Sequence, residues 1–150
     1  MKYLPLFSLV WISVFLIVWV IQFGWQKSVS AYYYELKNKV WFTLALWGFA
    51  APIMVYGSIM HGSPWFFIAG AGICFVGAAP DYKMSMEGDV HYISAVSGII
   101  IGLIAISLIG AWCVSIPTAL IIISINKIKN HTYWQELLAI YPIVLTLYLL

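Results

Sequence analysis

Residues 91–125 read HYISAVSGIIIGLIAISLIGAWCVSIPTALIIISI, a stretch without a single Asp, Glu, Lys or Arg. One α-helix of about 35 residues would be roughly 50 Å long, whereas the hydrocarbon core of a bilayer is about 30 Å thick. The stretch must therefore fold back on itself. We expect the turn at Gly110–Trp112 and Ser115–Pro117, because Gly and Pro interrupt helices. Two helices result, at residues 91–109 and 111–125.

The rest of the chain is equally apolar, with 64% hydrophobic and only 8% charged residues among 150. A water-soluble domain cannot cover so much apolar surface, whereas long uncharged runs are typical of transmembrane helices. We predict an all-α, polytopic transmembrane helix bundle that forms one domain over residues 1–150. The expected spans are residues 4–23, 40–60, 65–79, 91–109, 111–125 and 133–150, the last opened by Thr132 and Gln135 at capping-box spacing.

Lysine placement distinguishes six spans from five, which is the alternative. With six spans, one side of the membrane holds Lys27, Lys37, Lys39, Lys83, Lys127 and Lys129, and the other holds only Lys2. Five spans would give four lysines against three. Because positive loops stay in the cytoplasm, we predict six spans in the inner (plasma) membrane, with both termini on its outer (periplasmic) side.

Composition also excludes several function classes. The chain has no arginine and its seven lysines are scattered, so nucleic-acid binding is not expected. No ionisable residue falls in the middle of a predicted span, which argues against a proton pump or a charge-coupled transporter. Cys74 and Cys113 lie in apolar runs, where cysteine behaves as a small hydrophobe. We expect no cofactor and no metal.

Small residues at four-residue spacing predict close helix packing, because lipid tails are as apolar as leucine and helices associate through backbone approach. The expected contact joins the third and fourth predicted spans within one molecule, with a contact between two copies as the alternative. The residues assigned to it are Gly70, Cys74, Ala78, Ser94, Gly98 and Gly102.

Polar residues gather on the lysine-rich side, whereas His61 falls on the opposite side. Asp89 and His91 are expected to flank the start of the fourth span, where a helix N-terminus favours a carboxylate. Mixed nitrogen and oxygen ligation of a metal by His91 and the nearby acids is the alternative, although their spacing is irregular.

Three segments resemble a group of uncharacterised bacterial six-helix membrane proteins related to the Frag1/DRAM class. They are SVSAYYY at 28–34, AGAGICFVGAAPD at 69–81 and HYISA at 91–95, and the match covers roughly residues 25–110. The resemblance implies a lipid-related membrane function. The chain departs from the group in having Lys37 and Lys39 in place of arginine, and in its acidic loop 81–89.

We expect a non-enzymatic membrane protein that binds a lipid or small amphiphile at its cytoplasmic face, or a membrane subunit of a larger assembly. Membrane lipids are the expected partners, with a protein partner or a second copy as further possibilities. The alternatives are an enzyme acting on lipid headgroups, with His91 as base, and a homo-oligomeric pore or effector. The predicted ligand or partner contacts are Ser28, Ser30, Tyr32, Asp81, Asp89, His91 and Ser94.

Overall fold

The computed structural model is a bundle of helices and describes residues 1–78, 84–125 and 131–150, giving only the backbone for 84–88 and 131. No strand occurs among the residues it describes. The helices are α1 (Leu4–Phe23), α2 (Tyr32–Glu35), α3 (Val40–Met60), α4 (Pro64–Ala78), α5 (Met84–Ile106), the π-helical turn η2 (Ser107–Ala111), α6 (Trp112–Ser124) and α7 (His131–Leu149). The bounds of α1 and α3 match the predicted spans.

Three segments in the described part of the chain are long and apolar enough to cross a membrane. They are α1, α3 and the 36 residues Asp89–Ser124, which run through α5 and α6. The apolar helix α4 is shorter, at 15 residues, and α7 falls outside this group. Large apolar side chains point outward from the bundle, with Ile21 77% and Ile123 67% exposed. Such a surface suits lipid better than water.

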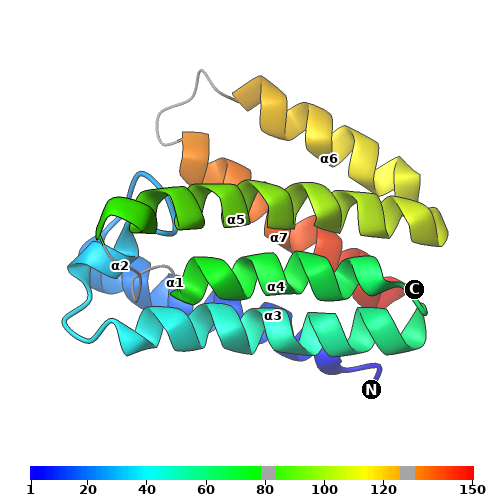
Figure 1. Ribbon diagram of the computed structural model, residues 1–150, viewed down its shortest axis with the longest axis horizontal. Helices are drawn as coiled ribbons and strands as arrows, with labels where there is room; N and C mark the ends of the chain where they lie inside the picture. Colours follow the sequence, from blue (N-terminus) through cyan, green and yellow to red (C-terminus); the bar gives the residue numbers. More distant parts are fainter. Residues whose placement is uncertain (79–83, 126–130) are drawn as a thin grey trace.

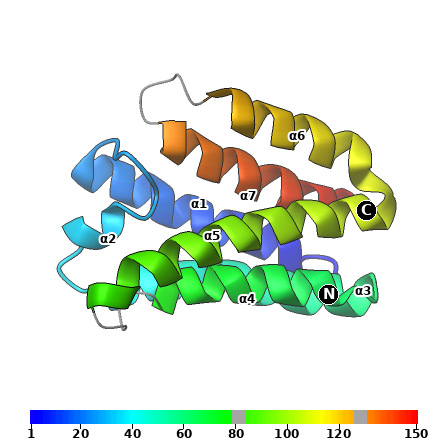
Figure 2. The same cartoon turned by 45° about the horizontal axis from the view of Figure 1, so that its top comes forward.

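The predicted fold-back is confirmed, and it occurs at Gly110. This residue has φ 93°, ψ 1° inside η2, a left-handed conformation that costs a residue with a Cβ about 1–2 kcal/mol. The chain reverses there, so that α6 returns beside α5 and α7 (Figures 1 and 2). Pro117, the other expected breaker, lies inside α6 without ending it.

The helices form two layers of three. In one layer α4 lies between α3 and α5; in the other, α7 lies between α1 and α6 (Figures 1 and 2). The layers meet where α1 packs on α3 and α7 packs on α5. At the first of these contacts the Trp11 indole N–H donates to the carbonyl of Ala45, 3.2 Å away. The helix α7 therefore touches α1, α5 and α6, and forms one wall of any space between them.

Glycines bring α4 and α5 close together. A methyl group added at Gly72 would lie 3.0 Å from the Cα of Gly98 and 3.0 Å from the carbonyl oxygen of Ser94. One added at Gly98 would lie 3.2 Å from the Ala69 carbonyl oxygen. Backbone thus approaches backbone along this contact, as small residues allow.

The residues responsible on α4 differ from the expected stripe. A methyl group at Gly70 would collide with Met54 of α3, and the carbonyl of Cys74 accepts a hydrogen bond from Trp47 of α3. Ala78 is the last residue of α4. The expected stripe therefore turns toward α3 at Gly70 and Cys74. On α5, Ser94 and Gly98 meet α4, whereas a methyl group at Gly102 would lie 3.0 Å from Ile143 of α7.

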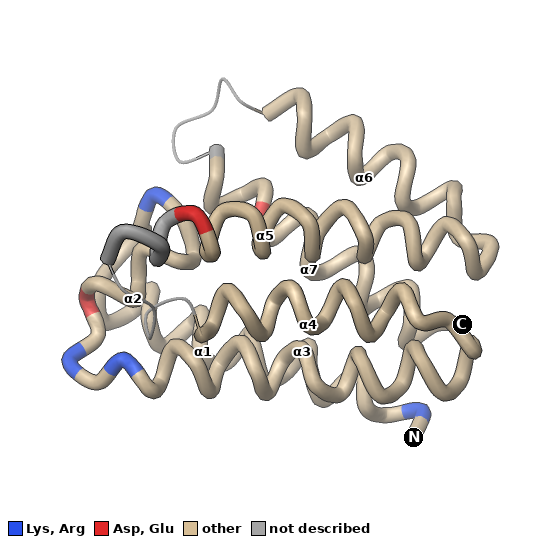
Figure 3. Tube along the Cα trace, in the orientation of Figure 1, with Lys and Arg blue, Asp and Glu red and all other residues tan. Residues whose placement is uncertain are grey.

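The two chain ends lie at the same end of the bundle (Figure 1). Lys2 is at this end, while Lys27, Lys37 and Lys39 are at the other end, beside α2 (Figure 3). We call the end with α2 and the 24–31 segment the loop end. Lys83, Lys127 and Lys129 lie outside the described residues.

The structure corrects the predicted start of the fourth span. α5 begins at Met84 instead of His91, because the stretch expected to be a polar loop contains no proline after residue 80 and its methionines and Glu87 favour helix. Asp89 consequently lies inside α5 and does not flank its N-terminus. Likewise α7 begins at His131, and Gln135 hydrogen-bonds the carbonyl of Ile122 in α6.

Candidate functional site

A cavity of about 560 Å³ lies near the loop end, between α5, α6, α7 and the 24–31 segment. Both polar and apolar residues line it. The polar lining residues are Ser28, Ser30, His91, Thr132, Gln135 and Glu136. The others are Tyr92, Ala95, Val96, Ile99, Ile100 and Ile122.

The cavity opens sideways between α5 and α6. Three lining residues of α5 are also exposed on the surface of the molecule: Tyr92 by 70%, Val96 by 39% and Ile100 by 52%. They are spaced four residues apart, so they follow one side of the helix. The two helices diverge from their turn at Gly110 toward the loop end (Figures 1 and 2). The mouth is consequently an apolar slit that faces the surroundings of the bundle.

The polar end of the cavity is built where the 24–31 segment docks on α7. The backbone N–H of Tyr133 donates to the carbonyl of Lys27, 3.1 Å away. The carboxylate of Glu136 accepts the backbone N–H of Val29. Ser28 and Ser30 hydrogen-bond each other at 2.9 Å. These contacts hold both serines over the first turns of α7.

An aromatic cluster supports the same segment from behind. Tyr32 is fully buried, and its hydroxyl donates to the carbonyl of Gly24 over 2.9 Å. Its ring lies against Trp19 and Tyr133, with centroids 5.5 and 6.3 Å away. Burial raises the pKa of the Tyr32 phenol, so the group stays a neutral donor. The hydroxyl is thereby engaged within the fold, and Tyr32 does not line the cavity.

The structure brings three of the seven predicted contact residues to the cavity, namely Ser28, Ser30 and His91. Asp89 is exposed in the second turn of α5 and is absent from the lining. The backbone of Ser94 lies against Gly72 in the α4–α5 contact. Asp81 is outside the described residues. The ligand role assigned to these residues stays a prediction.

Sequence reasoning missed Glu136, which lines this cavity and a neighbouring void. A signal for it was present: Glu136 is the one Asp, Glu, Lys or Arg inside any of the six predicted spans. Acidic residues in such segments usually face the interior of the bundle or a cavity. It is easily overlooked because it is the fourth residue of the last predicted span, and charged residues are common close to the boundaries of a span.

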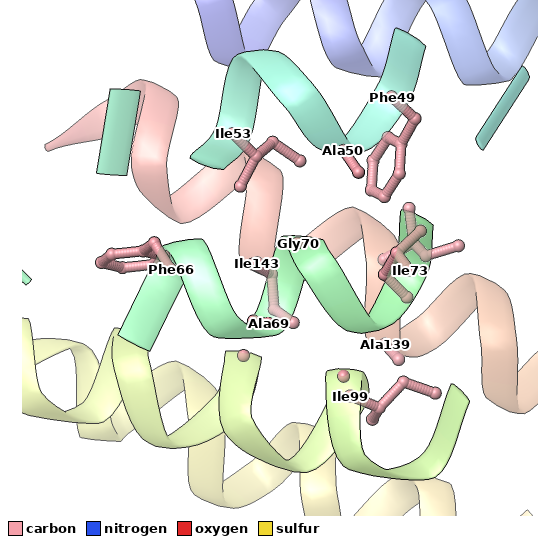
Figure 4. Close-up of a pocket in the computed structure, with 13 residues that line it drawn as sticks. Phe49, Ala50, Ile53, Phe66, Ala69, Gly70, Ile73, Ile99, Ala139 and Ile143 are labelled. Carbon is pink, nitrogen blue, oxygen red and sulfur yellow. The ribbon is translucent and has the colours of Figure 1, made fainter. Parts of the chain in front are cut away.

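Two smaller voids lie deeper in the bundle, and the second of them is lined by apolar residues alone. One of about 50 Å³ shares Ser30, Ala95, Ile99 and Glu136 with the large cavity. The other, of about 40 Å³, lies among α3, α4, α5 and α7, and its lining includes Ala69, Gly70 and Ile143 (Figure 4). Apolar cavities of this kind stay empty of water.

Possible metal ligands are dispersed along the described part of the chain. No group of three His, Cys, Asp or Glu side chains there lies close enough together to hold an ion. His61 follows the end of α3, at the opposite end of the bundle from His91 (Figure 1). Its ring packs between Tyr56 and Phe66.

Comparisons with protein-family models, curated proteins and solved structures find no match to this chain.

Proposed function

We propose that the chain is a small, non-enzymatic integral membrane protein that binds a lipid or small amphiphile in the cavity at its loop end. The observation that supports this proposal is the combination of polar and apolar side chains that line the cavity. Hydroxyl, imidazole, amide and carboxylate groups meet at one end, and apolar side chains of α5 and α6 line the rest. At about 560 Å³, it lies within the usual size of small-molecule sites, about 300–1,000 Å³.

The lateral mouth indicates how such a ligand would enter. An amphiphile in a bilayer presents its chain to the apolar surface of a membrane protein. An opening bordered by exposed Val96 and Ile100 lets the chain pass from lipid into the cavity without crossing water. The headgroup then meets Ser28, Ser30 and His91 at the polar end.

In this proposal the chain crosses a bacterial inner membrane six times, with the loop end in the cytoplasm. An even number of crossings agrees with the two chain ends lying at one end of the bundle (Figure 1). The described lysines other than Lys2 lie at the loop end (Figure 3), which agrees with the preference of lysine for the cytoplasmic side. The relation to the Frag1/DRAM group is a proposal of the same kind, and it too favours a lipid ligand.

The proposal is tested by photolabelling the purified protein in nanodiscs with a single-chain C12 probe carrying a diazirine near its headgroup. Ile122 of α6 lines the cavity, whereas its neighbour Ile123 is 67% exposed and does not. Ile122→Trp fills the cavity and is expected to reduce labelling of residues 91–100 at least fivefold. Ile123→Trp adds the same indole outside and serves as the matched control.

Peptide mapping of the labelled sites provides the readout, with the melting temperature of each variant as a check on folding. Equal labelling of wild type and Ile122→Trp would overturn the proposal, as would labelling spread evenly over all exposed helices.

A further inference from the structure

The described lining of the cavity contains an acidic side chain but no lysine. Among its described lining residues Glu136 is the one carboxylate, and there is no lysine. Lys27, the nearest lysine along the chain from Ser28, is exposed and does not line the cavity. The remaining polar groups are hydroxyls, an amide and the imidazole of His91. Among the described residues, a ligand in this cavity therefore meets one acidic group, Glu136, and no lysine.

Glu136 retains capacity to bind a ligand. A carboxylate offers two oxygens with about four acceptor positions, and the hydrogen bond from Val29 involves Oε2. Apolar neighbours such as Ala95 and Ile99 surround the same space. An ionised carboxylate in such surroundings is costly unless it is paired with an opposite charge.

We infer that the cavity selects amphiphiles with an ammonium headgroup, and that Glu136 provides the opposing charge. This inference rests on the proposed function. A primary ammonium group has three N–H donors, which match the Glu136 carboxylate and the hydroxyls of Ser28 and Ser30 at the same end of the cavity. A carboxylate or phosphate headgroup without a cation would be repelled by Glu136. Free long-chain amines and ethanolamine lipids share the required chemistry.

The test is competition against the photolabelling probe at pH 8, with three competitors of equal chain length: dodecylammonium, dodecanol and dodecanoate. For the wild type, dodecylammonium is expected to compete at a concentration at least tenfold lower than either of the others. Glu136→Gln keeps an acceptor for the Val29 N–H and removes the charge, so this preference is expected to fall below twofold. Glu35→Gln, at an exposed position of α2, is the matched control and is expected to keep the preference.

A fourth competitor distinguishes the two sources of the headgroup. Lysophosphatidylethanolamine carries the ammonium on a phosphate ester, and it competes like dodecylammonium only if the site accepts a lipid headgroup. If lysophosphatidylethanolamine competes more weakly than dodecanol, the site is assigned to free amines.

Failure of this inference is distinguishable from failure of the proposed function. If all competitors displace the probe equally in the wild type, or if Glu136→Gln keeps the amine preference, the charge assignment is wrong while amphiphile binding stands. If Ile122→Trp does not reduce labelling, the cavity itself is not the site.

Discussion

The helix α5 meets its two neighbours in different ways. Toward α4 it presents Ser94 and Gly98, and the two backbones approach so closely that a single methyl group at Gly72 would lie 3.0 Å from the Gly98 Cα. Toward α6 it presents Val96 and Ile100, and a cavity of about 560 Å³ separates the helices near the loop end. One helix therefore has a close-packed side and an open side.

The difference shows how a helical bundle can leave space between two of its helices. Apolar surface is not a driving force in lipid, so contacts depend on small residues that admit backbone approach. Where α5 carries branched side chains instead, α6 diverges from it beyond the turn at Gly110. The polar residues of the 24–31 segment and of α7 then border the space that is left.

The largest loss of stability is expected for Gly72→Val, on the close-packed side of α5. The added side chain would meet the backbone of Ser94 and Gly98, which cannot move away without separating α4 from α5. We expect the free energy of unfolding to fall by about 3 kcal/mol, the upper end for overpacking, measured by chemical denaturation in detergent micelles. Ala51→Val, at an exposed position of α3, is the control and should change stability little. Equal stability of the two variants would contradict the close contact.

A smaller effect is expected at the turn that separates α6 from α5. Nothing lies within 4 Å of where a Cβ of Gly110 would be, so Gly110→Ala tests the backbone conformation alone. The positive φ should cost about 1–2 kcal/mol in the same denaturation experiment. Gly110→Asn, which tolerates this conformation better, should lose less. If alanine is tolerated as well as asparagine, the turn is not held in the left-handed region.

The smallest change in stability is expected at Ala95→Leu, on the open side of α5. Ala95 lines the cavity and the adjoining void, so the larger side chain has space to occupy. We expect the free energy of unfolding to stay within about 1 kcal/mol of wild type, while photolabelling by the amphiphile probe decreases. A loss of stability as large as that of Gly72→Val would mean that both sides of α5 are close-packed.

Much of the helical arrangement is predictable because the responsible signals are local. Leu4–Phe23 and Val40–Met60 are uncharged runs between polar segments, and their bounds agree with the structure. The reversal in residues 91–125 followed from length, because a straight helix of that size does not fit a bilayer. The predicted start of α5, His91, was wrong by seven residues, since the helix begins at Met84. A polar segment with few helix breakers can be either loop or helix.

The candidate site was predictable only in part. Two long helices, α3 and α4, lie between the 24–31 segment and the start of α5. An even number of crossings returns the chain to the same end, so Ser28 and Ser30 share that end with His91. Whether a residue at that end borders the cavity depends on its neighbours in space. Tyr32 is directed into the aromatic cluster, and the backbone of Ser94 lies in the α4–α5 contact. Neither outcome is visible in the spacing of the motifs.

By itself, then, the sequence determined that the chain is helical, where α1 and α3 begin and end, and that the polypeptide reverses near Gly110. These features depend on uninterrupted apolar length and on local backbone preference. Only the tertiary structure decided that Gly72 rather than Gly70 meets α5, that a cavity separates α5 from α6, and that Glu136 borders it. In so apolar a chain, hydropathy does not distinguish the side of a helix that meets another helix from the side that meets lipid. That choice depends on side-chain packing between residues far apart in the sequence.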